Sequence, residues 1–222
     1  MACSDRFRVA RLFRHLARRC ASGVLPAALV GAAFAAAADA AELRAPESFA
    51  GVGDRAEQSR ALFREAGKVL QHPRCLNCHP VGERPTQGTA MRPHEPRVVR
   101  GPDDRGAAAM RCTTCHQQAN YEPSGVPGHP LWHVAPRSMA WQGRSLGEIC
   151  RQLKDERRNG GKTLAEIHEH MAHDSLVGWG WQPGGGREPA PGTQQQFGAL
   201  IAAWIQTGAE CPRDDGARAA AR

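Results

Sequence analysis

Cys75-Leu76-Asn77-Cys78-His79 and Cys112-Thr113-Thr114-Cys115-His116 are two copies of the pattern C-x-x-C-H. This spacing is the attachment signature of c-type haem. The two thiols of each copy are placed to add to the two vinyl groups on one edge of a porphyrin, and the adjacent histidine then lies under the ring as an iron ligand. We therefore expect two haem c groups, held covalently by Cys75, Cys78, Cys112 and Cys115, with His79 and His116 as the proximal iron ligands.

A Cys₄ zinc ribbon is the competing interpretation, because two C-x-x-C pairs are also the ligand spacing of zinc. That interpretation leaves both histidines unexplained. The chain has 10 histidines in 222 residues, so a histidine would follow both pairs by chance with a probability of about 0.2% on composition alone. Thioredoxin-like chemistry needs a βαβ context, which the sequence does not indicate. Haem attachment is the favoured interpretation.

The composition agrees with a chain that needs cofactors to complete its core. Only 5% of the residues are aromatic and 41% are hydrophobic, whereas 24 are glycine and 16 are proline. Two haems bring large apolar surfaces that such a chain lacks. No apolar run reaches the 18 residues of a strong membrane-spanning helix, so we expect no transmembrane helix in the mature chain and exclude an integral membrane transporter.

The N-terminal 40 residues have the organisation of a secretory signal peptide. Six arginines precede an apolar run from Val24 to Ala38, and Ala38-Asp39-Ala40 is a small-x-small cleavage pattern. We expect cleavage after Ala40 and localisation in the periplasm. Removing this segment leaves 23 basic and 20 acidic residues of the 29 and 22 in the whole chain, and without a basic cluster we expect no nucleic-acid partner.

The rest of the chain predicts a mostly α protein with long irregular loops. An amphipathic helix is expected over about 54–71, and residues 73–144, rich in proline, show no strand-like alternation. Capping-box patterns open three further helices, and the first of these is expected to end at Asn159-Gly160-Gly161. The capping pairs are Ser145 with Glu148, Thr163 with Glu166, and Thr193 with Gln196. The expected organisation is a linker over 41–53, a di-haem domain over 54–212 and a disordered tail over 213–222.

Cys150 and Cys211 are the cysteines that remain in the mature chain once the two motifs are assigned. One lies on an expected helix face and the other follows the last helix. In an oxidising compartment we expect them to form a disulfide.

The sixth ligand of each iron is left open by the sequence. Electron carriers usually fill this position with methionine or histidine, and methionine raises the potential. His94 and Met139 lie in proline-rich loops where no helical face explains their burial, so they are the leading candidates, and His170 is held in reserve. The run His168–His173 nearly spells the zinc-protease motif H-E-x-x-H, but its second histidine falls one position late.

Several stretches are similar to a known family. They are Trp132–Pro136, Ser138–Trp141, Gly147–Cys150, Arg158–Gly161, Leu176–Trp181 and Pro189–Gln194. Over about residues 55–212 the chain resembles proteobacterial di-haem c-type proteins described as isoquinoline 1-oxidoreductase subunits. The resemblance implies a periplasmic cytochrome that accepts electrons from a molybdenum hydroxylase. The helices before the first motif and at the C-terminal end also resemble the terminal helix pair of class I cytochromes c.

The expected function is electron transfer between a periplasmic dehydrogenase and a cytochrome or oxidase of the respiratory chain. The chain has neither a molybdopterin signature nor Fe–S cysteine spacing, so we expect an electron-transfer subunit and not an enzyme by itself. The alternatives are a di-haem peroxidase-like enzyme and a haem-based sensor, each of which keeps one coordination position open.

Overall fold

A computed structural model describes residues 42–214, which belong to the second of the two units of the chain, Ala38–Arg222. The expected signal peptide and most of the expected tail lie outside the described residues. Within residues 42–214 the secondary structure consists of seven α-helices, four short 3₁₀ helices and strands of only two residues each. The prediction of a mostly α protein is confirmed.

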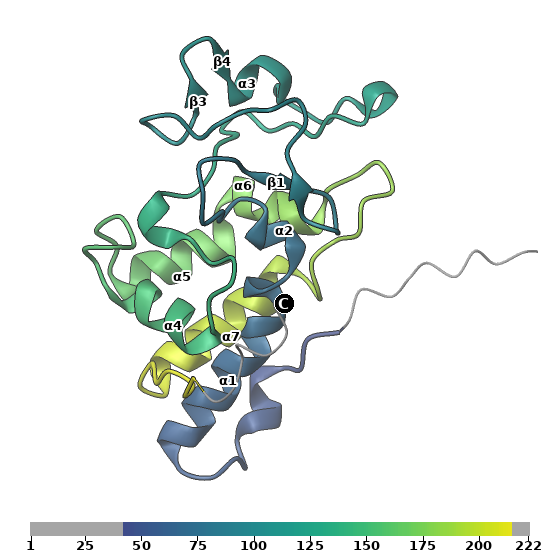
Figure 1. Ribbon diagram of the computed structural model, residues 1–222. Helices are drawn as coiled ribbons and strands as arrows, with labels where there is room; N and C mark the ends of the chain where they lie inside the picture. Colours follow the sequence, from purple (N-terminus) through teal and green to yellow (C-terminus); the bar gives the residue numbers. More distant parts are fainter. Residues whose placement is uncertain (1–41, 215–222) are drawn as a thin grey trace, which may run out of the picture. The chain divides into compact units, whose positions relative to one another are not determined.

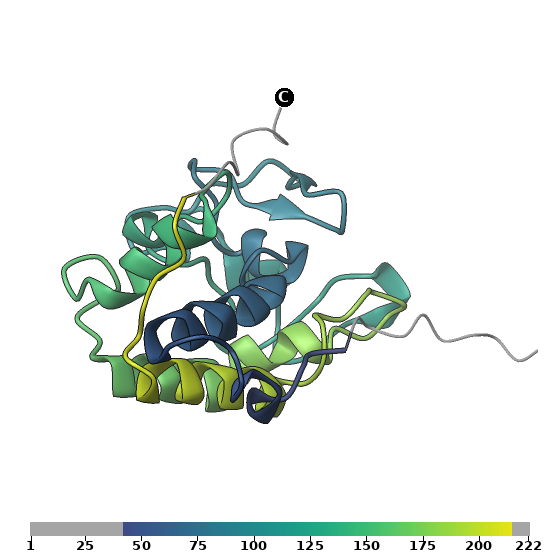
Figure 2. The same cartoon turned by 90° about the horizontal axis from the view of Figure 1, so that it is seen from below.

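Helices α1 (Arg55–Leu70) and α7 (Gln194–Gln206) lie side by side, as Figures 1 and 2 show. The Asp54 carboxylate caps α1 by accepting a hydrogen bond from the Glu57 amide. The rings of Phe63 and Trp204 are 4.8 Å apart at the centre of the pair, and both are fully buried. Burial of two such rings contributes several kcal/mol by area, about 1.5–3 kcal/mol per large apolar side chain.

Helices α4 (Leu146–Lys154) and α5 (Leu164–His173) complete the helical layer, and the capping boxes predicted for α4, α5 and α7 are all present. The prediction for the end of α4 was wrong by several residues, because α4 ends at Lys154. Asn159 explains the early end: its buried amide donates to the Leu153 carbonyl at 2.8 Å and so satisfies an acceptor that the helix leaves open.

The region between α1 and α4 is mostly irregular, as predicted, but it contains two small hairpins that the sequence pattern did not indicate. The second C-x-x-C segment forms the helical turn α3 (Cys112–Cys115), and the first begins at Cys75 within the helical turn α2 (Pro73–Leu76). The hairpins pair β1 (Thr86–Gln87) with β2 (Arg92–Pro93) and β3 (Gly106–Ala107) with β4 (Met110–Arg111). Strands of two residues are too short to show periodicity. In Figure 1, α3 and β3–β4 lie at the end of the view opposite α1.

The remaining elements are one short helix and four 3₁₀ turns. They are η1 (Pro46–Phe49), η2 (Glu122–Ser124), η3 (Arg137–Met139), α6 (Ser175–Gly178) and η4 (Trp179–Trp181). The hydrophobic core is formed by α1, α4, α5 and α7, with Met139 from the end of η3 and Trp141 from the loop that follows. The long loops are therefore anchored on one side by this helical layer.

Cys150 of α4 and Cys211, which follows α7, form a disulfide with an S–S distance of 2.08 Å. This is the pairing expected from the sequence. Residues 42–214 include no helix with the length and apolar character needed to cross a membrane.

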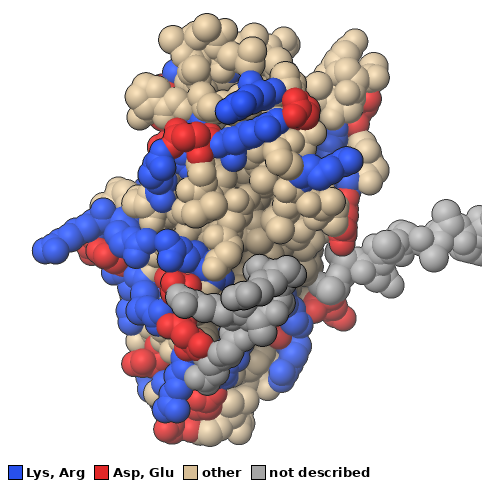
Figure 3. Space-filling model, viewed as in Figure 1, with Lys and Arg blue, Asp and Glu red and all other residues tan. Residues whose placement is uncertain are grey.

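Charged and apolar side chains are distributed unevenly over the described surface. Among residues 42–214, the large exposed hydrophobic side chains all fall between residues 81 and 131: Val81, Met91, Val99, Met110, Tyr121 and Leu131. Figure 3 shows the same contrast, since the part over α3 and β3–β4 is mostly uncharged whereas both signs of charge mix over the helical part.

Candidate cofactor site

The first motif lies at the wall of a cavity. His72 caps α2 by accepting a hydrogen bond from the Arg74 amide at 3.2 Å, and Pro73 occupies the first turn. Cys75 and Cys78 follow, and both thiols line a cavity of about 310 Å³ together with apolar side chains of the helical layer. Burial raises the pKa of Cys75 to about 12 and that of Cys78 to about 11, so both are neutral thiols. This volume falls within the usual range for sites of small molecules and cofactors.

His79 is held in one orientation by two contacts. Its Nδ1 lies 2.7 Å from the carbonyl oxygen of Met139, and its ring stacks on Trp141 with 3.4 Å between ring centres and 6° between planes. Because a carbonyl can only accept, Nδ1 carries the proton and Nε2 keeps the lone pair. Burial lowers the pKa of His79 to about 4, which keeps the ring neutral and able to bind a metal.

The second motif has the same construction from different residues. His116 Nδ1 lies 2.7 Å from the carbonyl oxygen of Pro127, and its ring stacks on Trp132 at 4.4 Å with 8° between planes. Burial also lowers the pKa of His116. Cys112 is partly buried and Cys115 is exposed, so this motif is more open to solvent than the first. In each motif, a backbone carbonyl and a stacked indole fix the histidine and leave its Nε2 free.

The two motifs face a common region. Trp132 stacks on His116 and also lines the cavity of the first motif. The centre of its ring lies 4.9 Å from that of Trp179, and the two ring planes are nearly perpendicular at 84°. One indole therefore contacts both sites.

The three candidates for the far side of the irons fall in different places. The His94 ring lies 5.8 Å from the His116 ring. His170 of α5 lines the cavity that contains His79, as does Met139. Met139, however, is only 6% exposed, and its own carbonyl bonds to His79. None of these placements tests coordination directly, so all three remain predictions.

Sequence reasoning missed three residues that organise the region. Trp132 and Trp141 orient the motif histidines, and the buried Arg100 ties the connecting loops together. Arg100 donates to the carbonyls of Pro80 and Ala135 at 3.0 and 2.7 Å. A single arginine or tryptophan in a loop has no spacing that reveals such contacts, so only the folded chain could identify them.

The residues present fit a haem. Each histidine offers Nε2 while its Nδ1–H is held by a carbonyl, which is the usual outer support of a metal-binding imidazole. The Trp141 indole N–H is buried and has no acceptor among residues 42–214, so a bound group with a carboxylate could supply one. No set of three or more His, Cys, Asp or Glu side chains in the same range could bind a metal ion alone.

Comparisons of the chain with protein-family models, with curated proteins and with solved structures found no match.

Proposed function

We propose that this chain is a di-haem c-type cytochrome that is exported to the periplasm and transfers electrons. The observation that carries the proposal is the duplicated geometry at the two C-x-x-C-H motifs, where His79 and His116 each have Nδ1 bonded to a carbonyl and one ring face covered by tryptophan. Loops of different sequence thus hold the two motif histidines in the same way, each with Nε2 left free. Histidines that serve only to pack the fold would not need this arrangement twice.

Each haem, when bound, supplies an iron that takes up and releases one electron. The chain determines the rest: Cys75 and Cys78 anchor the first haem, and Cys112 and Cys115 anchor the second. The stacked indoles keep each imidazole from rotating, which limits reorganisation when the charge on the iron changes. The apolar walls of the first cavity exclude water and favour the less charged state of its site.

The second site is the entry point for electrons from a partner protein. Cys115 is exposed, and the exposed apolar side chains Met110 and Tyr121 flank the second motif in the sequence, which suits contact with another protein. Trp132, in contact with both sites, lies between this entry point and the buried first site. The partners are a dehydrogenase as donor, of the molybdenum hydroxylase type that the resemblance implies, and a cytochrome or oxidase as acceptor.

Periplasmic localisation is supported by the Cys150–Cys211 disulfide, because such bonds persist in oxidising compartments. It also agrees with haem attachment, which needs an exported chain with reduced motif thiols.

The test is a count of covalent haem in protein exported together with the haem c maturation machinery. We expect two haems per chain after denaturation. The double variants Cys75→Ser/Cys78→Ser and Cys112→Ser/Cys115→Ser should each retain one, and Cys150→Ala/Cys211→Ala should retain two. A wild-type chain with no covalent haem, or with bound zinc instead, would contradict the proposal.

The spin state separates electron transfer from the alternatives. Two six-coordinate low-spin haems without affinity for peroxide support a carrier, whereas one high-spin haem that reacts with peroxide or binds CO supports a peroxidase-like enzyme or a sensor. The donor is tested by deleting the gene: unchanged oxidation of N-heterocycles or aldehydes by the native respiratory chain would exclude the proposed dehydrogenase partner.

A further inference from the structure

We propose that both haems carry a second histidine on the iron, His94 opposite His116 and His170 opposite His79. The inference rests on the function proposed above and adds the coordination of each iron. Coordination decides the potential of each site and whether small molecules can reach the metal.

The rings of His94 and His116 are spaced as two ligands of one metal. Their centres are 5.8 Å apart and their planes differ by 68°. Two imidazoles on opposite sides of a metal, each with a metal–nitrogen distance of about 2 Å, have ring centres about 6 Å apart. His94 Nδ1 lies 3.0 Å from the Pro96 carbonyl oxygen, so its Nε2, like that of His116, is left as the basic nitrogen.

The loop that carries His94 is fixed on both sides of the residue. The His94 amide donates to the Pro85 carbonyl at 3.0 Å. The His94 carbonyl accepts two hydrogen bonds from the Arg84 guanidinium, at 2.6 and 3.0 Å. A ligand on a loop held in this way loses little conformational freedom when it binds the metal, which favours coordination.

His129 is the neighbouring histidine that the structure makes unsuitable. Its Nε2 lies 3.1 Å from the Ser175 hydroxyl, and its Nδ1 accepts a hydrogen bond from the Leu131 amide at 3.1 Å. Both nitrogens are therefore occupied. His129 serves as a matched control.

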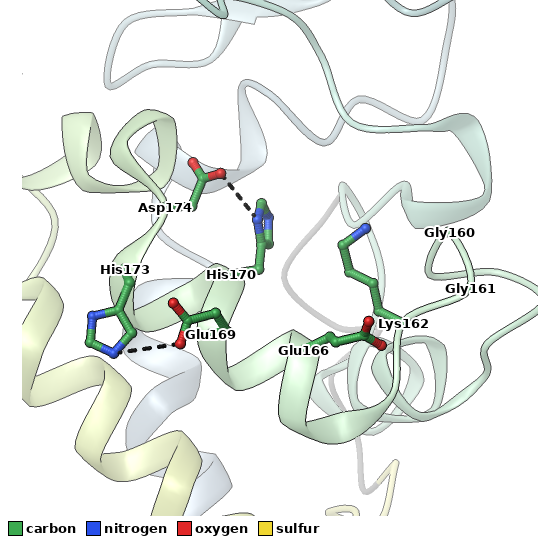
Figure 4. A pocket seen from close by; sticks show the side chains of 8 residues that line it. All are labelled: Gly160, Gly161, Lys162, Glu166, Glu169, His170, His173 and Asp174. Carbon is green, nitrogen blue, oxygen red and sulfur yellow. Dashed lines mark ion pairs between the residues drawn. The ribbon is translucent and has the colours of Figure 1, made fainter.

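His170 of α5 lines the same cavity as the first motif. Its Nδ1 is 3.5 Å from an Asp174 carboxylate oxygen, and the side chain lines the cavity that also contains Cys75 and His79. Figure 4 shows the His170 ring next to Asp174, while His173 extends to a different side of α5. The carboxylate would hold the Nδ1 proton and leave Nε2 for the metal.

His133 also lines this cavity, with its Nδ1 bonded to the Leu131 carbonyl, so His133→Ala is compared with His170→Ala in the experiment below. The two methionines of the cavity are less suited. The Ala135 amide donates to the Cys78 carbonyl and the Trp141 amide to the His79 carbonyl, so the segment 135–141 runs along the motif itself. Met139, in that segment, bonds to the Nδ1 of His79 through its own carbonyl, so its backbone lies on the side of the ring away from Nε2. Met171 is 4% exposed within the hydrophobic core. We assign His170 on α5 to the iron of the first motif, because it lines the cavity and an Asp174 carboxylate faces its Nδ1.

The experiment compares the absorption and electron paramagnetic resonance spectra of oxidised haem-loaded wild type, His94→Ala, His170→Ala and His133→Ala. His94→Ala and His170→Ala should each convert one of the two haems to high spin, which removes half of the low-spin signal, and added imidazole should restore it. His129→Ala, His133→Ala and His173→Ala should leave both signals unchanged. Wild type should show no methionine–iron charge-transfer band.

The outcomes separate the two levels of inference. Wild type with two covalent haems and a methionine–iron band that Met139→Leu removes would overturn the assignment of His170 and leave the proposed function standing. If His94→Ala keeps both low-spin signals, the assignment of His94 is overturned. If His170→Ala keeps both, the assignment of His170 is overturned. Absence of covalent haem from wild type would overturn the proposed function and both assignments with it. The wild-type spectrum decides between methionine and histidine even where a variant does not fold.

Discussion

A neutral imidazole can bind a metal only through the nitrogen that lacks the proton, so the partner of the other nitrogen sets its role. His79, His94 and His116 each direct Nδ1 to a backbone carbonyl. His129, in contrast, has a partner at both nitrogens. This difference between residues of one type is invisible in the sequence, because the carbonyls come from positions brought together by the loops.

Arg100 is a charged residue whose role likewise depends on backbone carbonyls that the loops bring together. It is 3% exposed and donates to the Pro80, Gly82 and Ala135 carbonyls and to the Asp104 carboxylate at 2.6 Å. The carbonyls belong to the segment after the first motif and to the segment that leads toward Met139. The guanidinium therefore joins the two sides of the loop system.

We predict that Arg100→Met lowers the free energy of unfolding by about 3 kcal/mol, because buried acceptors and the Asp104 carboxylate lose their donor. Chemical denaturation of the haem-loaded protein measures the effect. Arg105→Met is the control: its side chain is exposed, so the change should stay within about 0.5 kcal/mol. Equal stability of the two variants would show that Arg100 does not hold the loops.

At the scale of elements, the helices follow from local signals and their contacts do not. The capping boxes mark where α4, α5 and α7 begin. The close approach of α5 and α7 depends on a small residue at one point of contact. A Cβ atom on Gly198 would lie 2.6 Å from the Ala172 Cβ and 3.1 Å from its Cα.

Gly198→Ala is therefore expected to destabilise the protein by about 1–2 kcal/mol, since overpacking against the α5 backbone outweighs the better helix propensity of alanine. Gly67→Ala in α1 is the matched variant. Its added methyl group meets only the flexible end of Leu146, which can move, so propensity should offset most of the cost. Thermal unfolding of both variants measures the difference, and a Gly198→Ala protein as stable as Gly67→Ala would contradict the proposed contact.

At the scale of the whole described unit, the chain consists of a helical layer with its own core and a set of loops that surround the two motifs. The core contains the Phe63–Trp204 pair, and the Cys150–Cys211 disulfide joins α4 to the segment that follows α7. The motif loops are joined to it through the Met139–Trp141 segment. Changes in the helical layer should thus alter stability more than they alter haem attachment.

The disulfide tests this separation. Its cysteines are 61 residues apart, and closing a loop of that length stabilises the folded state by about 4 kcal/mol relative to the open chain. Cys150→Ala/Cys211→Ala should lose stability of this order in denaturant and still carry two haems. A thiol reductant should lower the stability of wild type and leave that of the variant unchanged. Loss of haem from the double variant would show that the two parts are coupled.

The sequence by itself was sufficient to predict the mostly α class, the starts of the long helices and the cysteine pair left over for a disulfide. These features depend on residues that are adjacent or one helical turn apart, together with elimination among few cysteines. The two C-x-x-C-H motifs are likewise local. Only the tertiary structure could place Trp132 and Trp141 on the motif histidines, bring the His94 ring centre to 5.8 Å from that of His116 and direct the Met139 carbonyl to Nδ1 of His79. Those contacts join residues that are far apart in the sequence and lie in irregular loops. Such loops have no periodic pattern from which the contacts could be predicted.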